Sequence, residues 1–161
     1  MAGHHHPSSA TLSTYPIVGV GFVGKSNKPL FIHSFEDDRD SDLELNLTIH
    51  SCLDVVDERA DPAASPYLGF LALMGRHSAF AMIGPTRVKV FCILDADHEP
   101  TPREEDMKQL LQTLHHAYCD WISNPFVEII PSEGEPTPGE KSRYFYDRIK
   151  RACESNHFIT K

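Results

Sequence analysis

Apolar residues first gather in two short runs near the start of the chain. The runs I-V-G-V-G-F-V-G at 17–24 and L-F-I-H-S-F at 30–35 are rich in β-branched and aromatic residues, which strands favour. The segment S-N-K-P between them has the composition of a turn. The pattern therefore predicts a β-hairpin, and the E-D-D-R-D-S-D segment at 36–42 predicts an acidic loop after it.

The spacing of apolar residues then lengthens, which predicts a helix from about Leu43 to Ala60. Its apolar stripe is expected to consist of Leu45, Ile49, Cys52, Leu53, Val56 and Ala60. His50, Asp54 and Asp57 share a different face of this helix, off the apolar stripe.

Three strand-like runs follow the breaker D-P-A-A-S-P, at 67–75, 78–85 and 87–95. The links between them are only a few residues long, too short for crossover helices. Neighbouring strands are therefore expected to be antiparallel.

The strongest helix start in the sequence is Thr101-Pro102-Arg103-Glu104. It offers a hydroxyl N-cap, a proline at the first helical position and the glutamate of a capping box. Helical spacing then continues to Asn124-Pro125, and its aromatic residues Tyr118 and Trp121, with Phe126 beyond them, are expected in the core rather than at an interface.

Residues 127–140 are rich in proline, glycine and glutamate and predict a loop, and a last helix follows it. That helix carries Phe145, Ile149, Ala152 and Cys153 on one side. The predicted order is β-β-α-β-β-β-α-α, without an internal repeat. This order is typical of the α+β class.

Composition narrows the class of protein. The chain has 161 residues and a formal net charge of −8, from 15 lysines and arginines against 23 aspartates and glutamates. This length predicts one domain, placed at 15–161 after a flexible arm at 1–14. The acidic balance argues against nucleic acid as a partner. We found no apolar run of membrane-spanning length and no apolar core of a signal peptide, so we expect a cytoplasmic protein.

The four cysteines, Cys52, Cys92, Cys119 and Cys153, lie in separate apolar segments and form no C-x-x-C pair. Two disulfides are one interpretation. Four reduced thiols that act as small apolar side chains are the favoured one, and their spacing implies no zinc site.

One segment matches a phosphate-binding motif. Gly19–Ser26 fits G-x-x-x-x-G-K-[ST], and Val90–Asp95 is an apolar strand that ends in an aspartate, as a magnesium-binding strand does. Such a loop requires a helix that begins at its Lys-Ser end. Here Pro29 follows closely and the next segment is strand-like. We interpret the match as accidental, with glycines that let a helix lie close to the sheet, and keep a small nucleotide-binding enzyme as an alternative.

Other patterns fit neither a catalyst nor a metal site. Asp38, Asp40 and Asp42 resemble the start of a calcium loop, but the glycine and glutamate that complete such a loop are missing. His115 and His116 are adjacent, so on a helix they point in different directions and do not chelate one ion together. We expect no catalytic residue, no metal and no cofactor.

Several segments, taken in order, resemble one known family. They are H-S-C-L-D-V-V-D-E at 50–58, Y-L-G-F-L at 67–71, T-R-V-K-V-F at 86–91, L-H-H-A-Y at 114–118 with N-P-F at 124–126, and Ser142-Arg143 with Phe145. Together they resemble the sedlin family, small longin-like subunits of the TRAPP vesicle-tethering complex. The resemblance covers Ile17 to Cys153. The N-terminal arm, the acidic loop at 36–42 and the insert near 130–140 are longer than in that family.

The resemblance implies a longin- or profilin-like fold, with a five-stranded antiparallel sheet, one helix on one face and two on the other. It implies a non-catalytic subunit that supports assembly of TRAPP and, through the complex, nucleotide exchange on a Rab-type GTPase. The implied setting is transport between the endoplasmic reticulum and the Golgi or within the Golgi, with peripheral membrane association only through the complex. Another longin-type adaptor, such as a coat-complex small chain, is a further alternative.

The resemblance also implies a binding residue. The family's first-helix aspartate, which is associated with holding partner subunits, corresponds to Asp54. Beside His50 and Asp57, its carboxylate can accept hydrogen bonds from an arginine or lysine of a partner. The alternative is an ordinary solvated acidic helix face. The unpaired edges of the sheet are the other surfaces where we expect partners.

Overall fold

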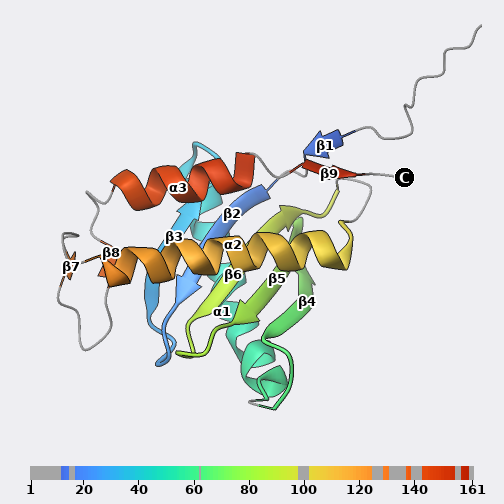
Figure 1. Ribbon diagram of the computed structural model, residues 1–161. Coiled ribbons are helices and arrows are strands. Elements are labelled where there is room, and N and C mark those ends of the chain that lie inside the picture. The colour runs from blue at the N-terminus through green and yellow to red at the C-terminus, as the bar shows by residue number, and fades with distance from the viewer. Residues whose placement is uncertain are drawn as a thin grey trace, which may run out of the picture.

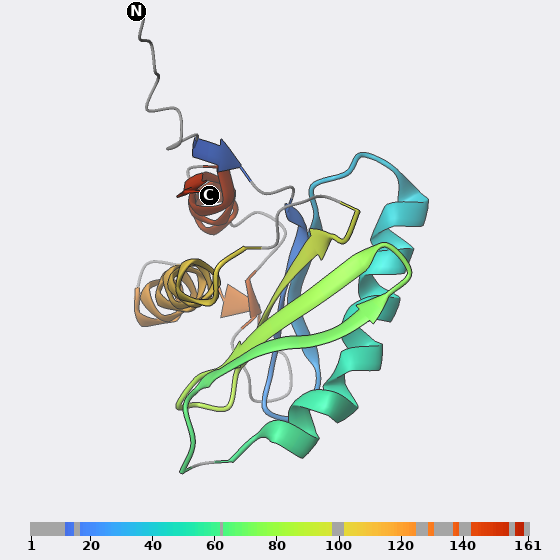
Figure 2. The same ribbon diagram turned by 90° about the vertical axis from the view of Figure 1, so that its right-hand side faces the viewer.

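The structure is a computed structural model, and it describes residues 12–14, 17–61, 63–97, 102–124, 129–130, 137–138, 143–154 and 157–159. Its main elements follow the predicted order. They are β2 (Ile17–Val23), β3 (Pro29–Ser34), α1 (Arg39–Arg59), β4 (Tyr67–Met74), β5 (His77–Ile83), β6 (Lys89–Asp95), α2 (Glu104–Ser123) and α3 (Arg143–Glu154). Figure 1 shows α2 and α3 lying across the sheet, and Figure 2 shows α1 on the opposite face. The predicted α+β architecture with helices on both faces is confirmed.

The sheet has five strands in the order β3-β2-β6-β5-β4, and every neighbouring pair is antiparallel. Both edge strands, β3 and β4, are therefore joined through α1, which crosses one face of the sheet from one edge to the other (Figure 2). The short links between β4, β5 and β6 force antiparallel pairing, as the sequence predicts.

The hairpins β2–β3 and β5–β6 close with the same backbone geometry. In the first, Gly24 N–H donates to the Lys28 carbonyl at 2.8 Å and Asn27 has a φ of 63°. In the second, Gly84 N–H donates to the Val88 carbonyl at 2.8 Å, and Arg87, in the same position as Asn27, has a φ of 70°. Asparagine tolerates this region well, which explains why S-N-K-P predicts a turn correctly.

The first helix begins earlier than predicted, so the expected acidic loop at 36–42 is wrong in its second half. Asp38 is the N-cap and accepts a hydrogen bond from Ser41 N–H at 2.5 Å, while Asp40 and Asp42 lie in the first turn. Carboxylates are stabilised at a helix N-terminus by the exposed N–H groups and the helix dipole. These acidic residues therefore start the helix rather than precede it.

The second helix begins later than predicted. Its N-cap is Arg103, which makes no capping hydrogen bond with its side chain, and the helix starts at Glu104 instead of Pro102. Arg103 Nε donates instead to Asp106 in the first turn at 3.2 Å. Three acidic residues in that turn interact favourably with the helix dipole, in place of the hydrogen bond that the hydroxyl cap was expected to accept. The predicted end at Asn124 is confirmed.

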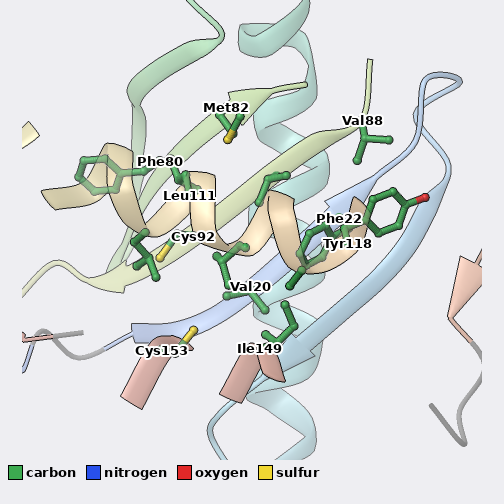
Figure 3. Packing of buried hydrophobic residues seen from close by; sticks show 14 of the residues in the cluster. Val20, Phe22, Phe80, Met82, Val88, Cys92, Leu111, Tyr118, Ile149 and Cys153 are labelled. Carbon is green, nitrogen blue, oxygen red and sulfur yellow. The ribbon is translucent and has the colours of Figure 1, made fainter. Parts of the chain in front are cut away.

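The face of the sheet under α2 and α3 holds an aromatic cluster (Figure 3). The Phe22 ring stacks on Tyr118 at a centroid distance of 5.6 Å and meets Phe145 edge to face, also at 5.6 Å. Tyr118 and Trp121 are each 2% exposed, which confirms the prediction that they are core residues. Phe126 lies outside the described residues.

The opposite face packs against α1 through a second apolar cluster. Leu45, Ile49, Cys52 and Val56 are fully buried, which confirms most of the predicted stripe. Two of them lie directly over glycines of β2. A Cβ at Gly19 would be 2.5 Å from Leu45 Cδ2 and 2.8 Å from the His33 carbonyl oxygen, and a Cβ at Gly21 would be 2.5 Å from Ile49 Cδ1. The glycines therefore leave room for side chains of the helix.

Two short ribbons add to the predicted elements. β1 (Leu12–Thr14) pairs with β9 (His157–Ile159), and β7 (Ile129–Ile130) pairs with β8 (Thr137–Pro138) inside the segment expected to be a loop. The expected arm at 1–14 lies outside the described residues up to residue 11, and the division of the chain at residue 15 stays a prediction. Within the described parts, no helix is long and apolar enough to cross a membrane.

We expect Gly21→Ala to lower the free energy of unfolding by about 1–3 kcal/mol, because the new methyl group overlaps Ile49 Cδ1. Adding Ile49→Val removes that atom, so the double variant should be less destabilised than the sum of the two single variants. Urea denaturation of the four proteins measures this coupling. Gly19→Ala is the matched comparison, since its methyl group also meets a backbone carbonyl that no side-chain change moves. Strict additivity at Gly21 and Ile49 would contradict the packing described here.

Candidate partner-binding site

The outer side of α1 is a continuous stripe that no other described element covers. Leu43, Leu47, His50 and Asp54 are spaced i, i+4, i+7 and i+11, so they share one face of the helix, opposite the buried stripe. Leu43 is 61% exposed and Leu47 is 58% exposed, and His50 and Asp54 are exposed as well. We call these four residues the outer stripe of α1. It combines an apolar half with a polar, acidic half.

Asp54 lies in the middle of the exposed face, as its position off the apolar stripe predicts. Its carboxylate forms no hydrogen bond or ion pair with any residue that the structure describes. An exposed, unpaired carboxylate is available to a cation of another molecule without loss of an internal interaction. Its role in binding stays a prediction.

Asp57 has a different environment from His50 and Asp54. Its carboxylate is 3.5 Å from Asn27 Nδ2 and 4.0 Å from Lys89 Nζ. Lys89 is only 3% exposed, and its ammonium group also donates to Asn27 Oδ1 at 2.5 Å. A buried ammonium group is costly unless polar partners surround it. Asp57 therefore helps hold Lys89, which ties α1 to the β2–β3 turn and to β6.

The two leucines of the outer stripe are not among the binding residues predicted from the sequence. The signal is present, because Leu43 and Leu47 are four residues apart and in helical phase with His50 and Asp54. The predicted helix begins at about Leu43, four residues later than α1 does, so Leu43 is a terminal residue of that helix and the face it shares with Leu47 is not apparent. Isolated exposed leucines are ordinary on a protein surface, whereas two adjacent ones on an uncovered helix face indicate a contact surface.

The phosphate-loop string does not form a phosphate loop. Gly19–Val23 belongs to β2, Lys25 and Ser26 lie in the tight turn, and β3 begins at Pro29. No helix N-terminus follows Ser26, so the dipole and N–H groups that would bind phosphates are not there. The structure thus confirms the interpretation of the match as accidental.

The aspartate that would hold magnesium is also in the wrong place. Val23, beside the turn, pairs with Lys89 at the start of β6, whereas Asp95 ends β6 at the opposite edge of the ladder. Six residues of strand separate the two, which corresponds to roughly 20 Å. Lys25 and Asp95 therefore do not meet in one site.

The two adjacent histidines of α2 have different surroundings. His115 lies over Gly84, and its ring nitrogen Nε2 is 3.6 Å from Cys119 Sγ. Burial lowers the pKa of His115 and raises the pKa of Cys119. His116 is exposed on a different side of α2. Within the described part of the chain, no group of three or more histidine, cysteine or acidic side chains is placed to hold a metal ion.

All four cysteines are free thiols, which confirms the favoured interpretation. Cys52, Cys92 and Cys153 are buried, and Cys119 is partly exposed. Burial raises the pKa of Cys153 to about 12, and it raises the pKa of Cys92 well above its usual value. Thiols with raised pKa values are poor nucleophiles at neutral pH, so these side chains serve as packing groups.

Comparison with known proteins agrees with this architecture. Residues 22–155 match the family model described as Sedlin. The chain is 28% identical over 116 residues to a protein of Xenopus tropicalis named trafficking protein particle complex subunit 2-like protein, and 27% identical over 116 residues to the protein of that name from Taeniopygia guttata. Each alignment covers 68% of this chain and 81% of the relative. A Dictyostelium discoideum protein of the same name is 27% identical over 117 residues, with the same coverage. The chain belongs to the sedlin family.

Proposed function

We propose that this protein is a subunit of a trafficking protein particle (TRAPP) complex and that it binds neighbouring subunits through the outer stripe of α1. The names of its relatives support the kind of complex. The observation that carries the binding site is the uncovered outer stripe, with Leu43 and Leu47 exposed on the same helix face as Asp54.

The chemistry of the stripe specifies its partner. Leucine side chains gain free energy when a partner removes them from water, about 25 cal/mol for each Å² of apolar surface. A lysine or arginine of the partner can then pair with Asp54, which fixes orientation more than it adds affinity. The partner surface is therefore apolar with a basic residue beside it. Exposed apolar patches with polar residues at their rim mark protein interfaces, so we assign this surface to a neighbouring subunit.

The role within the complex is assembly rather than catalysis. We propose that the protein supports TRAPP assembly and thereby nucleotide exchange on a Rab-type GTPase, in transport between the endoplasmic reticulum and the Golgi or within the Golgi. Its location would be cytoplasmic, at the surface of these membranes, and held there through the complex. Supporting this role, the residues of the phosphate-like motif are used for a strand and a turn, and three buried cysteines are used for packing.

We expect Asp54→Tyr to reduce recovery of the other TRAPP subunits by about tenfold when the tagged protein is purified from cells. The bulky ring blocks the stripe and removes the carboxylate, but it replaces no buried contact, so circular dichroism and the melting temperature should stay unchanged. The double variant Leu43→Ser/Leu47→Ser should have the same effect through loss of apolar contact. Quantitative mass spectrometry of the purified complexes measures both.

Glu105→Tyr is the matched control, because Glu105 is an exposed acidic residue of α2, on the other face of the sheet. This variant should retain all subunits. Full recovery of the partners by Asp54→Tyr and by the double leucine variant would remove the outer stripe from the interface.

We expect neither ATP nor GTP to bind the protein with magnesium present. The turn at Lys25 and Ser26 has no helix N-terminus to hold the phosphates. Equilibrium titration with fluorescent nucleotide analogues, on the wild type and on Lys25→Ala, tests this. Saturable binding that Lys25→Ala abolishes would favour the enzyme alternative over the assembly role.

A further inference from the structure

A groove lies at the other end of α1 from Asp57, between the first turns of that helix and the turn that joins β4 to β5. It has a volume of about 530 Å³. Leu47 and Met74 form its apolar wall, and they are 58% and 36% exposed. The acidic side chains at its rim are Glu36, Asp38, Asp40 and Glu44. We call it the acidic groove.

Part of the acidic rim is held in place by internal hydrogen bonds. Ser41 N–H donates to Asp38 and the Ser41 hydroxyl donates to Glu36 Oε2 at 2.6 Å. The hydrogen bonds from Ser41 lower the pKa of Asp38, which keeps this carboxylate ionised. A pre-positioned carboxylate loses little conformational freedom when it meets a cation.

The carboxylates of the two other rim residues, Asp40 and Glu44, have no partner among the described residues. The side chains of Asp40 and Glu44 form no hydrogen bond or ion pair with the residues that the structure describes. Arg76 is the one basic residue among the groove's lining, so four carboxylates and one guanidinium give the groove a net charge of −3 with histidine neutral. A groove with this charge attracts cations and repels acidic segments.

The floor of the groove is polar and rigid. Thr48 Oγ1 donates to the Glu44 carbonyl at 2.9 Å and lies 2.9 Å from His77 Nδ1. Thr48 donates its hydroxyl proton to the Glu44 carbonyl, so its oxygen accepts a hydrogen bond from His77 Nδ1. The other ring nitrogen of His77, Nε2, is then the unprotonated one. Thr48 and His77 are 5% and 6% exposed. The floor therefore belongs to the folded core, so a ligand enters a preformed groove.

We propose that the acidic groove binds an extended segment of another protein, in which an arginine or lysine stands next to a large apolar residue. The cation meets Asp40 and Glu44, and the apolar side chain packs on Leu47 and Met74. Charge complementarity selects this occupant, since an acidic peptide would face four carboxylates and a purely polar basic one would leave the apolar wall in water. The acidic groove shares Leu47 with the outer stripe of α1 but does not include Asp54. The proposal does not depend on the TRAPP assignment.

The test uses the full chain and three labelled nine-residue peptides that alternate two residues. These are arginine with leucine, glutamate with leucine, and arginine with serine. Fluorescence anisotropy should show saturable binding of the arginine–leucine peptide, no binding of the glutamate–leucine peptide, and at least about tenfold weaker binding of the arginine–serine peptide. Equal binding of both arginine peptides, or no saturable binding, overturns the proposal.

Substitutions in the acidic groove test whether the peptide binds there. Asp40→Asn/Glu44→Gln should weaken binding of the arginine–leucine peptide by about tenfold, because two charge pairs are lost. The matched control Glu58→Gln/Glu105→Gln removes the same charge from exposed positions outside the groove and should stay within about twofold. An equal loss in the control would mean attraction by the net charge of the chain, which overturns the proposal. Asp38 and Glu36 are left unchanged because they support the helix start.

A second readout distinguishes binding in the acidic groove from binding at the Asp54 end of the outer stripe, since the two surfaces share only Leu47. In amide NMR spectra, the peptide should shift the signals of Thr48, Arg76 and His77. Asp54→Tyr should bind the peptide like the wild type, whatever its effect on recovery of TRAPP subunits. Shifts confined to other residues, or loss of peptide binding in Asp54→Tyr, would overturn the acidic groove as the site.

Discussion

The fold depends on how closely α1 approaches the middle of the sheet. Gly19 and Gly21 are two residues apart in β2, so both face α1. The side chains of Leu45 and Ile49 occupy the space above them. A larger residue at either of these two positions would push the helix outward. Because α1 also joins the two edge strands, such a displacement would be felt by the connections at both edges of the sheet.

Among the elements that the structure describes, α1 alone forms the outer layer on its side of the sheet. On the other face, α2 and α3 bury an aromatic cluster, and α3 packs through Phe145 onto Phe22 and Tyr118. No described element covers the back of α1, so that back remains at the surface (Figure 2). Two leucines placed there have no internal role, and for this reason the outer stripe is the surface we assign to a partner.

The charged residues at the ends of α1 are used in different ways. At its C-terminal end, Asp57 joins Asn27 in holding the buried Lys89, so a residue that the sequence suggests for binding also supports the fold. At its N-terminal end, Asp38 caps the helix, while Asp40 and Glu44 remain available at the acidic groove. Both ends of α1 thus carry a carboxylate with an internal partner close to carboxylates that are open to another molecule.

Local patterns along the chain are enough to predict the order of the main elements, most of the buried stripe of α1, the core role of Tyr118 and Trp121, and the turn at Lys25-Ser26. These follow from local periodicity and turn chemistry, which need no distant partner. Which exposed residues meet depends on how the elements are arranged in space, and no local pattern predicts it. The partners Asn27, Asp57 and Lys89 lie on three elements, the acidic groove joins the start of α1 to the β4–β5 turn, and β1 pairs with β9 from the far end of the chain. Such contacts depend on strand order and on the path of α1, and a surface side chain leaves little trace of them in the local pattern because many residue types are tolerated there.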